Sequence, residues 1–111
     1  MRMWNVDPKL QCRAHLLGEH RECHALIGII LHKKPLSGTK YITTGLVEVH
    51  NIKQRHNELV LEMTRRGYNH KSPLPDADLW TEGQVDSAQN LIELRTRCPE
   101  CAKLQLVNQQ P

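Results

Sequence analysis

The chain has 111 residues, which is enough to bury one hydrophobic core and leaves no room for a second. Fifteen Lys and Arg residues against twelve Asp and Glu residues, with a pI near 8.8, make it mildly basic. That charge permits a polyanionic partner without requiring one. Phe is absent and aromatic residues make up only 4% of the chain. We therefore expect an all-α protein, a compact single domain over residues 1–111 with three main helices and long connecting loops.

No stretch of the sequence approaches the ~18 apolar residues that a membrane span needs, and the N-terminus lacks the apolar run of a signal peptide. We expect a soluble cytoplasmic protein, monomeric and without a membrane partner. Four cysteines in such a compartment are better explained as thiols or metal ligands than as disulfides.

In chain order, Asp7 and Pro8 form the first start signal, with Asp as N-cap and Pro at the first helical position. The main helix is predicted over residues 12–32, followed by Pro35. Its inner face should contain Leu16, His20, Cys23, Ile27 and Ile30 or Leu31. Residues 33–45 are rich in Pro, Gly, Ser, Thr and Lys, which predicts an exposed basic loop and a candidate phosphate contact.

A second helix is predicted over residues 46–66, capped by Thr43 or Thr44 and ended by Gly67. Residues 67–84 contain two glycines and two prolines, so they should form a long irregular crossing. A third helix is predicted over residues 85–97, with Ala88, Leu91, Ile92 and Leu94 facing inward. The remaining residues are expected to be a short, fraying tail.

Glu22 stands in an unusual place for a helical glutamate. Its neighbours on the helix surface at i−4, i+3, i+4 and i+7 are small or apolar: Gly18, Ala25, Leu26 and Ile29. A glycine inside a helix costs ~1 kcal/mol relative to alanine, so Gly18 suggests that something approaches the backbone beside Glu22. The alternative is a structural glutamate paired with a cation of another helix.

Two motifs indicate a family. Residues 15–22 read HLLGEHRE and residues 65–69 read RRGYN. The chain resembles the pyrimidine-dimer DNA glycosylases of the bacteriophage endonuclease V type, whose first long helix carries H-L-x-x-E-x-R-E and whose second ends K-R-G-F-N. The order of helices and loops also agrees over most of the chain, more loosely in the last third.

The resemblance implies a DNA repair glycosylase with abasic-site lyase activity on UV-induced pyrimidine dimers in double-stranded DNA. In the family the N-terminal α-amine attacks C1′ of the damaged nucleotide and the helix glutamate assists, with no cofactor. The matching catalytic groups here are the amine of Met1 and the carboxylate of Glu22. The family's best-known member loses its initiator Met, whereas gapless alignment places Met1 itself at the mature terminus, and the bulky Arg2 should prevent Met removal.

Chemistry supports the same pair of groups. An α-amine is less basic than a lysine amine, so a larger part of it is neutral at pH 7 and can form an imine with an aldehydic sugar carbon. A nearby carboxylate can exchange protons or stabilise the cationic imine. Two rivals stay open: a lyase or glycosylase acting on another lesion, and a non-catalytic DNA-binding module of the same fold.

For DNA binding, the resemblance carries over three residues as phosphate or substrate contacts: Arg2, His15 and Arg21. Six further residues are candidates because of their own charge and position: His24, Lys33, Lys34, Arg65, Arg66 and Lys71. The chain departs from the family at Ala25, where an arginine is usual, and it lacks the aromatic C-terminal tail.

Metal binding is considered for two sets of residues. His20 and His24 share a helix face, but core packing for His20 and a DNA-facing rim for His15 and His24 explain them without a metal. Cys98 and Cys101 form a C-x-x-C pair that needs a second ligand pair to hold zinc. Cys12 and Cys23 lie about three helical turns apart and cannot share one ion. We therefore expect no metal site.

Overall fold

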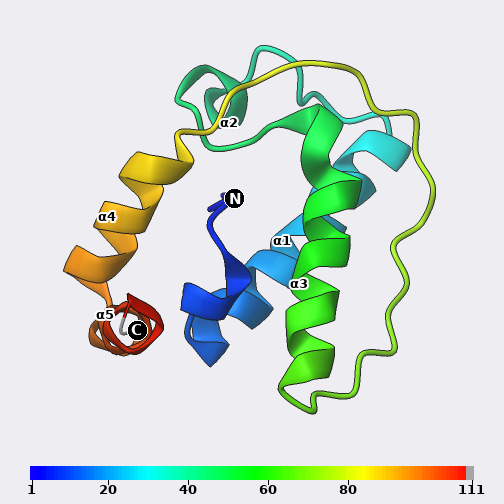
Figure 1. Ribbon diagram of the computed structural model, residues 1–111. Coiled ribbons are helices and arrows are strands. Elements are labelled where there is room, and N and C mark those ends of the chain that lie inside the picture. The colour runs from blue at the N-terminus through cyan, green and yellow to red at the C-terminus, as the bar shows by residue number, and fades with distance from the viewer. Residues whose placement is uncertain (110–111) are drawn as a thin grey trace.

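The computed structural model describes residues 1–109, with side chains as far as Val107 (Figure 1). Its regular structure in that range is entirely helical, which confirms the all-α prediction. The elements are η1 (Pro8–Leu10), α1 (Arg13–Leu31), α2 (Lys40–Thr43), η2 (Val49–Asn51), α3 (Ile52–Arg65), α4 (Ser87–Arg97) and α5 (Pro99–Gln109). None of the helices in the described part of the chain is long and apolar enough to cross a membrane.

The first two elements begin where the sequence places them. The side chain of Asp7 accepts a hydrogen bond from the backbone N–H of Lys9 and caps η1, with Pro8 at the first position. Helix α1 lies between Cys12 as N-cap and His32 as C-cap, in agreement with the predicted range 12–32.

Helix α3 begins later than predicted, because the residues before it bond to other segments. The Leu46 carbonyl accepts from the N–H of Met3 at 2.8 Å, and the Val49 N–H donates to the carbonyl of Glu82 at 2.9 Å. The predicted threonine cap is wrong, since Thr43 ends the short helix α2 inside the predicted loop. The C-terminus is as predicted: Gly67 has φ +84°, a left-handed conformation that favours glycine.

The last third differs most from the prediction. Helix α4 begins at Ser87, where the Asp86 side chain accepts from the Gln89 N–H at 3.0 Å. Ala88 and Ile92, predicted to face inward, are exposed, because α4 buries the stripe that contains Asn90 and Leu94. The predicted fraying tail is instead helix α5, with Pro99 at its first position.

The main core lies between α1 and α3, with the irregular crossing wrapped round them (Figure 1). Its largest fully buried apolar side chains are Met3, Leu16, Leu26, Ile27, Ile52 and Leu59. A second, smaller cluster joins the N-terminal segment and the start of α1 to helices α4 and α5: Trp4, Val6, Cys12, Leu94 and Cys101. The N-terminal segment therefore lies between the two groups of helices.

Candidate active site

The N-terminal segment is held by three different parts of the chain. Besides the Met3 bond to Leu46, the Trp4 N–H donates to the carboxylate of Glu19 on α1 at 3.0 Å. From α4, the side-chain amide of Asn90 donates to the Trp4 carbonyl at 2.9 Å. Figure 1 shows the chain start between α1 and α4. These bonds fix the residues that follow Met1 and therefore restrict where its amine can reach.

Arg2, a predicted DNA contact, has protein partners. Its guanidinium lies 3.7 Å from the ring centroid of Trp4 and donates to Asn90 Oδ1 at 2.8 Å. It also forms an ion pair with Glu93 of α4, which lowers the pKa of that carboxyl. Arg2 therefore links the N-terminal segment to α4.

A cleft of about 230 Å³ runs between this segment and α1. Its walls are Arg2, Trp4, Ala14, His15, Gly18, Glu19 and Glu22. Gly18 faces open space, since a Cβ added there would meet no atom within 4 Å. No protein group approaches the backbone at Gly18, so the cleft leaves room for a ligand at the place where the sequence suggested one.

Glu22 is half-buried on this cleft, and its carboxylate has no hydrogen-bond or ion-pair partner among residues 1–107. Glu19, one turn earlier, has the opposite environment. It is fully buried and accepts from Arg55 Nε at 2.6 Å and Nη2 at 2.8 Å, and from the Gln11 amide at 2.8 Å. The structural ion-pair role considered for Glu22 therefore belongs to Glu19.

Met1 is half-buried and its side chain packs against the main core. The site thus has an amine at the start of an anchored segment, a carboxylate without a partner, and an open cleft bounded by that segment. A primary amine is a nucleophile towards an aldehydic carbon, and a carboxylate can exchange protons with the product. This chemistry requires no metal-bound or organic group.

Four of the predicted DNA contacts are exposed, and their side chains have no hydrogen-bond or ion-pair partner in the described chain: Arg21, Lys33, Lys34 and Lys71. Lys33 and Lys34 follow the end of α1, and Lys71 follows His70 in the irregular crossing. These cations are free to bind phosphates.

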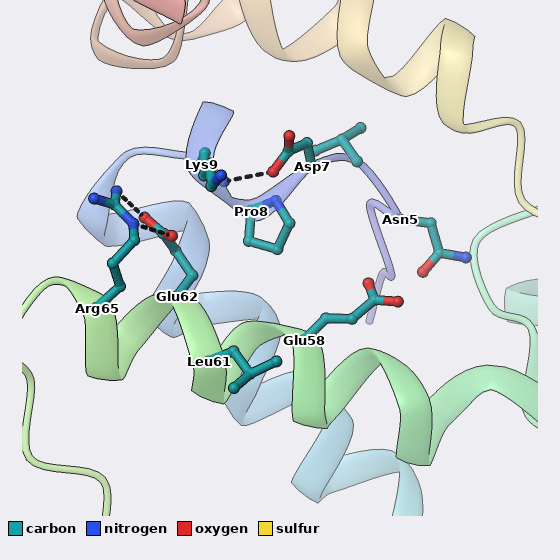
Figure 2. Close-up of a pocket in the computed structure, with 9 residues that line it drawn as sticks. Asn5, Asp7, Pro8, Lys9, Glu58, Leu61, Glu62 and Arg65 are labelled. Atoms are coloured by element: carbon teal, nitrogen blue, oxygen red, sulfur yellow. Dashed lines mark hydrogen bonds and ion pairs between the residues drawn. The ribbon is translucent and has the colours of Figure 1, made fainter.

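Arg65 and Arg66 both donate hydrogen bonds to Glu62, and Figure 2 shows the pair of Arg65 with Glu62. The Arg65 side chain is 59% exposed and donates twice to Glu62, at 2.7 and 2.6 Å. Arg66 is only 15% exposed and also donates to the carbonyls of Pro8 and Gln11, at 3.0 and 2.6 Å. The hydrogen bond from Arg65, with that from Arg66, holds the pKa of Glu62 below its usual value. Arg66 is therefore a structural tie between α3 and η1.

Beside these arginines lies a larger cavity of about 410 Å³, between η1 and α3. Figure 2 shows Glu58 and Glu62 on its α3 wall. Glu58 pairs with the buried Arg55 at 3.1 Å, so both carboxylates already have cationic partners. Lys9 and Arg65 also line this cavity, and each of the carboxylates on its wall already has a hydrogen-bond or ion-pair partner. We therefore take the smaller cleft beside the unpartnered Glu22 as the candidate active site.

His15 lies against three cysteines. Its Nδ1 is 3.2 Å from Cys12 Sγ and 3.5 Å from Cys101 Sγ, and Cys12 Sγ is 3.8 Å from Cys98 Sγ. Cys12 and His15 therefore form the second ligand pair whose absence led us to expect no metal. This pair contains a histidine, so it does not appear among the cysteines alone. The signal was present in the sequence, since Cys12 and His15 have the same spacing as Cys98 and Cys101.

His24, also a predicted DNA contact, belongs to a cluster with His20, His56 and His70. The ring centroids of His20 and His24 are 4.8 Å apart, and those of His20 and His56 are 4.9 Å apart. Burial, and then the neighbouring histidines, lower the pKa of His20 to about 4, so its imidazole is neutral at physiological pH. The sequence indicates only the pair His20 and His24, because nothing in it places His56 and His70 beside them.

One family model matches this chain. Neither the curated proteins nor the solved structures contain a match to this chain. The family model described as pyrimidine dimer DNA glycosylase matches residues 1–76, which include the N-terminal segment, α1, α3 and the candidate cleft. That match covers well over half of the 111 residues and confirms the resemblance read from HLLGEHRE and RRGYN. The chain belongs to the pyrimidine dimer DNA glycosylase family.

Proposed function

We propose that the protein is a DNA repair glycosylase with abasic-site lyase activity on UV-induced pyrimidine dimers in double-stranded DNA. The observation that carries the proposal is the state of Glu22. It is a half-buried carboxylate without a partner in the described chain, on a cleft walled by the anchored N-terminal segment. Family membership adds the substrate class.

In this mechanism the neutral amine of Met1 attacks C1′ of the damaged nucleotide. A C1′–N bond forms with the protein while the glycosidic bond to the base breaks, and ring opening gives an imine. Loss of a proton from C2′ then expels the 3′ phosphate by β-elimination, and water releases the amine. Glu22 exchanges protons in these steps and stabilises the cationic imine. An α-amine suits the first step because a larger part of it is neutral at pH 7 than of a lysine amine.

DNA binding in this proposal depends on the exposed cations without protein partners, Arg21, Lys33, Lys34 and Lys71. C1′ is inaccessible inside a regular duplex, so the DNA must bend or the nucleotide must leave the stack. Phosphate contacts on both sides of the lesion can hold that distorted form. The protein would act as a monomer and without a cofactor in the chemical steps.

Reductive trapping tests the mechanism directly. Borohydride added during reaction with dimer-containing duplex should convert the imine into a stable covalent adduct, and peptide mapping should place that adduct on Met1. Protein with a chemically acetylated α-amine is the matched control and should give none. An adduct on an internal lysine, or none on any damaged substrate, would overturn the mechanism.

The same experiment separates the two rivals. Trapping on abasic DNA but not on dimer-containing DNA would indicate a lyase that needs another enzyme to remove the base. Selective binding of damaged duplex without any adduct would indicate a non-catalytic DNA-binding module of the same fold.

A further inference from the structure

The cysteine and histidine cluster is built from two helix starts. Cys12 is the N-cap of α1 and His15 lies in the first turn of that helix. Cys98 is the C-cap of α4 and directly precedes α5, and Cys101 lies in the first turn of α5. Each pair has a spacing of three residues, which brings both side chains to the same side of a helix start. The four ligand atoms all lie within 4.8 Å of one another.

The distances agree with a tetrahedral zinc site. Zinc bonds of roughly 2.3 Å to sulfur and 2.0–2.1 Å to nitrogen place two sulfurs roughly 3.8 Å apart, and a sulfur and a nitrogen roughly 3.5 Å apart. The distance from Cys12 Sγ to Cys98 Sγ is 3.8 Å, and that from Cys101 Sγ to His15 Nδ1 is 3.5 Å. Three thiols and one imidazole, with ligand atoms all within 4.8 Å of one another, supply the four ligands of a tetrahedral site.

Two of the sulfurs accept hydrogen bonds from backbone N–H groups. The backbone N–H of Cys12 donates to Cys101 Sγ at 3.3 Å, and that of Cys101 donates to Cys98 Sγ at 3.4 Å. Such donors stabilise negative sulfur, as outer-shell groups do around metal ligands. Soft sulfur ligands select zinc over magnesium or calcium. Three cysteines cannot all pair as disulfides within one chain, and a metal ion uses all three together with His15.

We propose that Cys12, His15, Cys98 and Cys101 bind one structural zinc ion that fastens the C-terminal helices to the start of α1. Residues 77–111, which contain α4 and α5, lie outside the family match, so this site would attach the added segment to the family domain. A zinc ion bound to His15 would also hold the wall of the candidate cleft, which contains His15 and Trp4. The ring of His15 lies edge-on to Trp4 at 5.6 Å, and Trp4 packs under Arg2.

Elemental analysis and cobalt substitution test this site. The full chain, expressed with zinc, should lose one zinc ion per chain in Cys98→Ser and in Cys101→Ser, and none in Cys23→Ala, whose buried thiol lies outside the cluster. Cobalt added to zinc-free wild type should produce a thiolate-to-cobalt charge-transfer band, a readout that needs no variant. Wild type without that band, or zinc binding unaffected by both serine variants, would overturn the proposal.

An independent observation indicates a second metal site. His20 and His24 of α1, His56 of α3 and His70 of the crossing bring one ligand nitrogen each within 4.8 Å of the others. The Nε2 atoms of all four are buried and have no hydrogen-bond partner within the described chain. A buried polar atom without a partner is costly, and four of them in one place are poorly explained by ring packing alone.

Two of the four rings make a hydrogen bond outside the cluster, and for His56 the nitrogen involved is Nδ1. His56 Nδ1 lies 3.1 Å from the side-chain oxygen of Asn57, and His24 has a hydrogen bond to the backbone of Ser72. A hydrogen bond donated by Nδ1 leaves the lone pair on Nε2, which is the arrangement found in metal-bound histidines. Neutral imidazoles are preferred ligands of zinc and neighbouring transition metals.

We infer that these four histidines bind a second zinc ion, which ties the irregular crossing to α1 and α3. His70 lies at the start of that crossing, which has no helix or strand between Arg65 and Ser87. The two sites differ in donor set, three sulfurs and one nitrogen against four nitrogens, and can therefore be measured separately in one protein.

Metal stoichiometry tests the second site. Wild type should bind two zinc ions per chain, and His24→Gln or His70→Gln should bind one while keeping the thiolate-to-cobalt band. His32→Gln, an exposed histidine at the end of α1, should still bind two. In Cys98→Ser, cobalt should still bind and give weaker bands without thiolate character. One zinc per wild-type chain, or two in His24→Gln and His70→Gln, would overturn this inference.

Discussion

Helix α1 carries two glutamates one turn apart in opposite environments. The Glu19 side chain is fully buried, and Arg55, Gln11 and the Trp4 N–H donate to its oxygens. Glu22 lies on the open cleft, and its oxygens have no partner among the residues described. A carboxylate whose oxygens all have partners holds the fold together, whereas one without partners on a cleft is available for chemistry.

The comparison is tested most strongly at Glu22. Glu22→Gln preserves size and removes the carboxylate, so we expect strand cleavage of dimer-containing DNA to fall about 10²–10⁴-fold, the usual contribution of acid–base groups. Damaged-DNA affinity should stay within a few-fold, and the urea midpoint should not change, because Glu22 supports no other group. Gel assays of cleavage and binding measure both. Near-normal turnover in this variant would make Glu22 structural.

Glu19→Gln should show the reverse pattern. The variant leaves the buried Arg55 with only the part-exposed carboxylate of Glu58 as a counter-charge. Breaking a buried ion pair costs about 3–5 kcal/mol, and the remaining pair with Glu58 places the expected loss at the lower end of that range. We expect urea unfolding to show that loss of stability while Glu22→Gln shows none. Equal stability of the two variants would contradict the distinction between the two glutamates.

Gly18 lines the same cleft as Glu22, so a substitution there tests whether the cleft must stay open. Gly18 and Gly28 both lie in α1, and a Cβ added at either meets no atom within 4 Å. Alanine should therefore raise stability at both positions, by about 1 kcal/mol at most. Only Gly18→Ala places a methyl group in the cleft, so it should lower cleavage about tenfold or more, equivalent to about 1.4 kcal/mol in the barrier. Loss of activity in Gly28→Ala as well would remove the cleft from the explanation.

Local signals predicted much of the fold. Asp7 and Pro8 placed η1, Gly67 ended α3, and apolar spacing gave α1 almost to the residue. Helix α5 was missed because its sequence lacks a strong apolar stripe, and its start is set by contacts of Cys98 and Cys101 with the distant Cys12. Local periodicity carries no information about such contacts.

The candidate site was predicted unevenly for the same reason. The motif indicated Glu22, and the helical spacing indicated an open surface at Gly18. Both predictions depend only on residues of one helix, α1. That Arg66 is tied to η1 depends on a contact between residues more than fifty positions apart, as does the meeting of His15 with Cys101. A basic side chain looks the same in a sequence whether it faces phosphate or a buried carbonyl.

The smallest expected effect concerns the two arginines after α3. If both bound phosphates, neutralising them together would flatten the plot of log K against log salt by roughly 2, since each contact contributes about 0.9. The structure leaves only Arg65 accessible, because Arg66 is occupied by Glu62 and two carbonyls of the η1 region. Arg65→Gln should therefore flatten the slope by at most about 1 and leave lesion preference unchanged, since phosphate contacts carry no lesion information directly.

Arg66→Gln should leave the slope unchanged and lower the urea midpoint instead. Affinity for damaged and intact duplex across a salt series measures the first effect. A flatter slope in Arg66→Gln at unchanged stability would show that this arginine leaves Glu62 to bind DNA.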